Sequence, residues 1–161
     1  MTTISHPPST NWCRILIAVA LLVVIALGAV TSSVAELSPG SPELIEPQQL
    51  LKVLDSPSKP IVLFVGPKMM YAQAHIRGAE FIGGPARPEY LEALRKRLAT
   101  LPKSSFIVLY CGCCPWEHCP NIQPAYKEAK AAGFTNAKVL YLPTSFGVDW
   151  VDKGYPVVKG Q

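Results

Sequence analysis

Four of the five cysteines of this 161-residue chain lie in one short segment, CGCCPWEHCPN, which runs from Cys111 to Asn121. They are Cys111, Cys113, Cys114 and Cys119. A thiolate is a nucleophile and a soft metal ligand, so this grouping allows covalent catalysis, disulfide exchange or metal binding. Cys111 directly follows the apolar run 106–110, which predicts a buried strand. We therefore expect Cys111 at the carboxyl end of a strand, where open α/β sheets bind ligands.

That position should favour the ionised form of Cys111. Loop amides follow the strand, and the next helix is predicted to begin at Ile122. Backbone N–H groups and a helix N-terminus stabilise negative charge, and such surroundings lower a thiol pKa below its free value of about 8.5. We expect Cys111 to be the nucleophile of the segment, with a lowered pKa.

Other interpretations of the cysteines stay open. The first is a pair of structural disulfides. In that case Cys119 would pair with Cys113 or Cys114, because a bond between Cys111 and Cys113 is harder to form. A metal ion or iron–sulfur cluster is another, held by the C-x-x-C pair Cys111 and Cys114 with His118 and Cys119. A thioredoxin-like dithiol formed by that same pair is the third, but too little chain follows Thr144 for that fold.

The remaining pattern alternates strands with helices. Apolar runs predict strands at 61–65, 81–82, 106–110 and 139–142, and helical spacing predicts helices at 47–54, 88–101 and 122–132, with one helical turn at 147–153. This alternation is typical of an α/β sandwich around a small, mainly parallel sheet.

The amino-terminal segment predicts export. Residues 15–30 carry no charged or polar side chain, and Ser33 and Ala35 fit a small-x-small cleavage site. We expect residues 1–35 to be a signal peptide or an N-terminal membrane anchor, 36–46 a linker, and 47–161 the folded domain. The domain would then be periplasmic, or anchored in the inner membrane facing outward, and would touch the membrane only through 15–35 if the leader is uncleaved.

The charge balance argues against a nucleic-acid partner. Fifteen basic side chains stand against eleven acidic ones, which gives a formal net charge of +4 without a basic stripe.

Three stretches resemble the rhodanese family of sulfurtransferases. Residues 71–79 (YAQAHIRGA) resemble the family's Tyr…Gly-His-Ile-x-Gly-Ala segment, with Ala74 in place of the glycine. Residues 106–111 (FIVLYC) resemble the strand that ends in the persulfide-forming cysteine. Asp149-Trp150 followed by residues 154–157 (GYPV) resembles the family's closing segment. Order and spacing agree over roughly residues 48–157.

The resemblance implies a rhodanese-like three-layer sandwich and sulfur transfer through a persulfide on Cys111. The sulfur would come from a small donor of the thiosulfate or polysulfide type and pass to a thiol acceptor, without cofactor or metal. Backbone N–H groups of the loop would stabilise the negative charge. The residues expected to bind the donor are Gly112, Cys113, Cys114, Trp116, Glu117 and His118.

Two departures from the family pattern carry expectations of their own. Phe64 and Gly66 stand where the family has Asp-x-Arg, so a structural ion pair is missing. The loop is longer and holds three extra cysteines. Cys113 is expected to be too close in sequence to reach Cys111 without strain. Cys114 is therefore predicted as the resolving thiol, exchanging with Cys119 and needing a thiol reductant, unless those two form a permanent disulfide.

The other notable side chains are assigned mainly to packing. His75 and Trp150 are predicted to be buried structural residues. Trp116 either lines the donor-binding pocket or packs as the hydrophobic centre of its own loop. His118 either takes part in acid–base chemistry or is a solvated loop residue.

Overall fold

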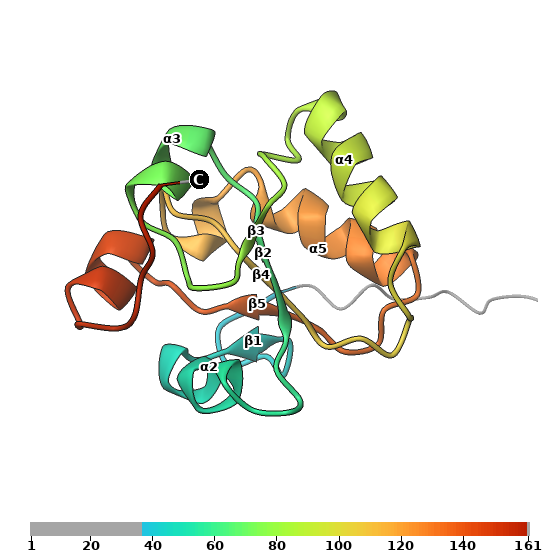
Figure 1. Cartoon of the computed structure of the whole chain (residues 1–161). Coiled ribbons are helices and arrows are strands. Elements are labelled where there is room, and N and C mark those ends of the chain that lie inside the picture. Colours follow the sequence, from blue (N-terminus) through green and yellow to red (C-terminus); the bar gives the residue numbers. More distant parts are fainter. Residues whose placement is uncertain (1–36, 161) are drawn as a thin grey trace, which may run out of the picture. The chain divides into compact units, whose positions relative to one another are not determined.

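Five parallel strands form a single sheet in the computed structural model, which describes residues 37–160 (Figure 1). The sheet order is β1-β5-β4-β2-β3. The strands are β1 (Leu44–Ile45), β2 (Ile61–Phe64), β3 (Glu80–Phe81), β4 (Ile107–Tyr110) and β5 (Ala137–Leu140). Every pairing is parallel, so all carboxyl ends lie at one edge. The predicted α/β class with a small parallel sheet is confirmed.

The two central strands are buried on both faces. In β2 and β4, Leu63 and Leu109 point toward one hydrophobic cluster, whereas Phe64 and Tyr110 point toward the other. All four side chains are fully buried. This explains why the sequence shows continuous apolar runs rather than alternation, because a parallel sheet is covered on both sides.

Helices cover both faces and complete three layers. On one face lie α4 (Pro88–Ala99) and α5 (Ile122–Ala131), while α2 (Pro47–Leu54), α3 (Lys68–Gln73) and the π-helical segment η2 (Gly147–Val151) lie on the other (Figure 1). Proline at the first turn of α2 and α4 fits the helix start, because its fixed φ suits that position. The three-layer arrangement predicted from the sequence is present.

Three details differ from the sequence prediction. The segment expected to be a linker at 36–46 contains β1, which pairs with β5, so the fold begins before residue 47. The two residues of β1 give too short a pattern to indicate a strand. Helix α3 was not predicted because its residues, KMMYAQ, bury no side chain fully and so show no apolar stripe. Strand β5 begins two residues earlier than expected.

Aromatic packing fills the place of the ion pair that the family pattern has at positions 64 and 66. The Phe64 ring lies against Tyr71, Phe81 and Tyr110, with ring centroids 5.4, 6.3 and 5.1 Å away. Such tilted and edge-to-face pairs stabilise a core beyond their buried area. The end of β2 is thus held by apolar contact in place of charge.

His75 and Trp150 have the packing roles predicted for them. The buried His75 ring stacks on Tyr71, and its Nδ1 lies 2.8 Å from the Tyr71 carbonyl oxygen. Trp150 is fully buried and donates its Nε1–H to the carbonyl of Pro156 at 3.0 Å.

The predicted leader, residues 1–35, lies outside the described residues, so export stays a prediction. Within residues 37–160, no helix has the length and apolar character needed to cross a membrane.

The Tyr110 hydroxyl next to the cysteine segment provides a stability test. It accepts the backbone N–H of Ile76 at 2.9 Å inside the core. Tyr110→Phe leaves that N–H unpaired, so we expect the free energy of unfolding to fall by about 1–3 kcal/mol in urea melts.

Tyr126→Phe is the matched control. The Tyr126 hydroxyl is buried without a hydrogen-bond partner in the described part of the chain. Its removal should leave stability unchanged or raise it. Equal losses in both variants would show that the Tyr110 hydrogen bond does not hold this region together.

Candidate functional site

Cys111 lies at the carboxyl end of β4, as predicted, and only 3% of its surface is exposed. It belongs to the cluster beneath α4 and α5. Gly66, just beyond the end of β2, lies directly against the Cys111 sulfur and leaves no room for a side chain at position 66. A Cβ at Gly66 would lie 2.9 Å from Cys111 Sγ and 2.9 Å from Phe64 Cζ, closer than real side chains approach. Glycine at 66 is therefore what leaves room for the thiol.

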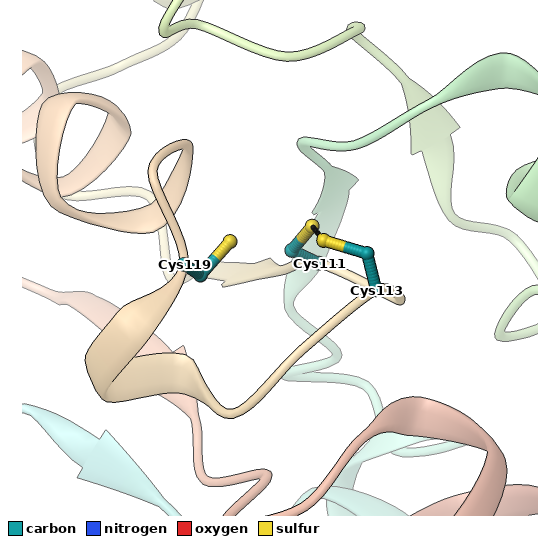
Figure 2. Close-up of side chains that lie close together, drawn as sticks. All are labelled: Cys111, Cys113 and Cys119. Atoms are coloured by element: carbon teal, nitrogen blue, oxygen red, sulfur yellow. Dashed lines mark hydrogen bonds between the residues drawn. The ribbon is translucent and has the colours of Figure 1, made fainter.

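The loop brings its thiols together (Figure 2). Cys113 Sγ lies 3.3 Å from Cys111 Sγ, and Cys114 Sγ lies 3.1 Å from Cys113 Sγ. Cys111 is buried, Cys113 exposed and Cys114 half-buried, and all are free thiols. Cys113 was expected to be too close in sequence to reach Cys111 without strain, yet the two sulfurs lie within hydrogen-bond distance. The extended loop turns back on itself directly after β4, so the second residue along points its side chain at the first.

Cys119 approaches the same point from the other end of the loop. It follows the 3-10 turn η1 (Trp116–His118), and its backbone N–H donates to the Trp116 carbonyl at 3.3 Å. Figure 2 shows its sulfur directed toward Cys111. The Sγ atoms of Cys111, Cys113 and Cys119 all lie within 4.8 Å of one another.

This grouping reverses the expected acidity of Cys111. Its pKa is raised well above the ordinary value, first by the hydrogen bond with the Cys119 thiol and then by burial. The Cys113 backbone N–H and thiol act the other way and lower it. The prediction of a lowered pKa is therefore wrong, because the effects of Cys119 and of burial outweigh those of the Cys113 backbone N–H and thiol. Burial and the Cys113 thiol also raise the pKa of Cys114 to about 11.

A cavity of about 280 Å³ lies next to Cys111 and is separated from its thiol by Gly66 and Asn121, which both approach the sulfur. Its lining residues are Gly66, Pro67, Lys68, Gly84, Ala86, Arg87, Tyr90 and Asn121. Asn121 joins the cavity to the thiol, since its Nδ2 donates to Cys111 Sγ at 4.0 Å while its Oδ1 accepts the Ala86 N–H at 3.3 Å. Arg87 is paired with Glu89 at 2.7 Å. Within residues 37–160, Lys68 has no ion-pair partner and is the free cation of the cavity.

Lys68, Arg87 and Asn121 were not singled out from the sequence. Lys68 follows β2 and Arg87 follows β3. The carboxyl ends of these two strands lie at the same edge of the sheet as the carboxyl end of β4. Asn121 immediately precedes α5, a position where Asn is favoured. The order of the strands in the sheet could have indicated these residues, because ligands of open α/β sheets bind beyond the carboxyl ends of the strands.

The other predicted binding residues do not present a side chain to the Cys111 thiol. Trp116 is buried and packs against Tyr141, with ring centroids 6.2 Å apart, so it plugs the loop. Glu117 and His118 are exposed on η1, and in the described part of the chain neither side chain hydrogen-bonds to a cysteine. Gly112 is buried against Phe64, where a Cβ would lie 3.3 Å from Cε2.

Comparison with known proteins agrees with this architecture. The rhodanese-like domain of the Alr3790 protein from Anabaena sp. matches with a TM-score of 0.54 at 24% identity, over 74% of this chain and 80% of that one. A crystal structure of the Alr3790 protein gives 0.53 at 21% identity, over 71% and 91%. The chain has a rhodanese-like fold.

A larger protein contains a similar unit. EanB, solved in complex with hercynine, matches with a TM-score of 0.55 at 24% identity over 72% of this chain, which spans only 27% of EanB. No protein-family model and no curated protein matched the chain. What the chain shares with these rhodanese-like structures is the fold.

The raised pKa predicts how the reactivity of Cys111 depends on pH. At neutral pH the thiol form dominates, and the thiolate fraction grows about tenfold per pH unit below the pKa. Alkylation of Cys111 by iodoacetamide, followed by peptide mass spectrometry, should therefore accelerate steadily into the alkaline range.

Cys119→Ala removes the largest cause of the raised pKa. We expect the alkylation profile of Cys111 to move to lower pH and its rate at pH 7 to rise several-fold. Cys114→Ala is the matched control, because Cys114 does not contribute to the shift at Cys111. A profile that stays in place in Cys119→Ala, or moves upward, would contradict this electrostatic account.

Proposed function

We propose that the protein is a sulfurtransferase that carries sulfane sulfur as a persulfide on Cys111. The observation that carries this proposal is a buried thiol at the carboxyl end of β4, held against Gly66 and Asn121, which line a cavity together with the free cation Lys68. Thiosulfate and polysulfides are anions, and cations near a cleft raise the local concentration of such donors. The rhodanese-like fold of the chain is consistent with this chemistry.

The first half-reaction uses Cys111 as nucleophile. The Cys111 thiol releases its proton to solvent, and the resulting thiolate attacks the sulfane sulfur of the donor. The new S–S bond forms as the donor's own S–S bond breaks, and the leaving group, sulfite in the case of thiosulfate, takes the bonding electron pair. The Cys113 backbone N–H and the Asn121 amide both point at Cys111 Sγ, where they stabilise negative charge.

The second half-reaction passes the outer sulfur on. Because Cys113 Sγ lies 3.3 Å from Cys111 Sγ, we assign the receiving role to Cys113 instead of Cys114. The Cys113 thiolate attacks the outer sulfur, which regenerates the Cys111 thiolate and leaves the persulfide on an exposed residue. A thiol acceptor then takes the sulfur from Cys113. Attack on the inner sulfur would instead release hydrosulfide and leave a disulfide that needs a thiol reductant.

Turnover assays with thiosulfate or polysulfide and a thiol acceptor test the role of Cys111. Cys111→Ser should reduce transfer to the background rate, since a hydroxyl is a far weaker nucleophile near neutral pH. Cys114→Ser, which changes another thiol of the same loop, should keep most of the activity. Transfer that persists in Cys111→Ser would refute the proposal.

Single-turnover measurements separate Cys113 from Cys111. In Cys113→Ser the persulfide should still form on Cys111. Its transfer to a protein thiol should slow about tenfold, an activation cost of about 1.4 kcal/mol, because Cys111 is buried. Transfer to cyanide, a small acceptor that can enter the cavity, should change little. Equal slowing with both acceptors would show that Cys113 is not a relay.

A further inference from the structure

Cys111, Cys113 and Cys119 form a three-sulfur group, and the transfer steps proposed above do not use the Cys119 thiol. Their Sγ atoms lie within 4.8 Å of one another, with the closest pair 3.3 Å apart. Cys114 approaches Cys113 to 3.1 Å but lies outside this group. The grouping of three thiols at one point, two of them buried, therefore needs its own explanation.

The spacing of the three sulfurs fits one metal ion. At a metal–sulfur distance of about 2.3 Å, three thiolates around a common centre lie about 4 Å apart. The Cys111 and Cys113 sulfurs lie 3.3 Å apart and no pair is separated by more than 4.8 Å, so small rotations of the side chains would form the site. Cys111 enters from the end of β4 and Cys119 from the far end of the loop, and Figure 2 shows the Cys119 sulfur directed toward Cys111, whose own sulfur lies against that of Cys113.

The donor set selects the metal. Structural zinc sites take four ligands, and within residues 37–160 no fourth His, Cys, Asp or Glu ligand joins this group. His118, the nearest imidazole in sequence, is exposed on η1. Thiolates without imidazole or carboxylate ligands favour the soft monovalent copper ion.

We propose that Cys111, Cys113 and Cys119 bind one Cu(I) ion in a trigonal thiolate site. Binding replaces three S–H protons with three Cu–S bonds, and no atom changes oxidation state. Exposed Cys113 provides the route of entry, while buried Cys111 and Cys119 keep water from the ion. The Asn121 amide and the Cys113 backbone N–H donate toward Cys111 Sγ and offset part of the thiolate charge.

Copper binding also regulates the proposed transfer reaction. Cys111 is both nucleophile and ligand, so a copper-bound Cys111 cannot attack a sulfur donor. This consequence rests on the proposed function, whereas the site itself does not. The copper-loaded protein should show no transfer activity, and removal of the ion by a competing chelator should restore it.

Anaerobic titration of the reduced full chain tests the site directly. The probe is Cu(I) held by the chromogenic chelator bicinchoninate, whose colour fades as the protein withdraws copper. The parent should take up one equivalent, and X-ray absorption should show three sulfur ligands at about 2.3 Å. Zn(II) in place of Cu(I) should bind at least about a hundredfold more weakly, a difference of about 2.8 kcal/mol.

Serine variants define the ligand set. Cys113→Ser and Cys119→Ser should each lose copper affinity by about a hundredfold or more, whereas Cys114→Ser should match the parent. Cys113 is exposed, so Cys113→Ser keeps the test valid if replacing the buried Cys119 unfolds the loop. Failure of the parent to take up copper, or an equal loss in Cys114→Ser, would overturn the proposal.

Activity measurements keep the two proposals distinguishable. Undiminished sulfur transfer by the copper-loaded parent would show that Cys111 is not a ligand and would overturn the site. Copper uptake with the expected ligand set, in a protein that transfers no sulfur under any condition, would support the site and refute the proposed function.

Discussion

The close approach between the ends of β2 and β4 is the constraint on which the site depends. Cys111 leaves the sheet beside Gly66, and a single added carbon at Gly66 would lie 2.9 Å from both the Cys111 sulfur and the Phe64 ring. Phe64 in turn packs against Tyr110, the residue before Cys111. The room for the thiol therefore depends on the absence of a side chain at Gly66. An arginine at 66, as in the family pattern, would not fit this arrangement.

The same packing explains the enlarged loop. With Cys111 only 3% exposed, a large acceptor has no direct route to its sulfur. In the proposed transfer, sulfur passes from buried Cys111 to exposed Cys113, whose Sγ atoms lie 3.3 Å apart. Trp116 fixes the loop by burying its side chain in the core, and the Trp116 N–H donates to Leu142 at 3.0 Å. Trp116 thus anchors the loop, whereas the proposed chemistry belongs to Cys111 and Cys113.

Sequence patterns predicted the central fold well because burial controls it. The runs at 61–65 and 106–110 are apolar since both faces of the sheet are covered, and Cys111 follows from the end of the second run. β1 and α3 were missed because a two-residue strand and a helix with no fully buried side chain leave no periodic signal. The Cys111 pKa was predicted in the wrong direction. Its main cause is Cys119, eight positions away, and only the path of the loop brings the two thiols together.

The central claim is that Cys111 receives the sulfur, and locating that sulfur tests it most directly. The reduced protein would be exposed briefly to thiosulfate or polysulfide, alkylated and fragmented by tandem mass spectrometry, with and without a thiol acceptor. The account predicts one additional sulfur atom on Cys111 at the earliest times, later appearance on Cys113, and loss of both when acceptor is present. Sulfur that appears first on Cys114 or Cys119, or on no cysteine, would contradict it.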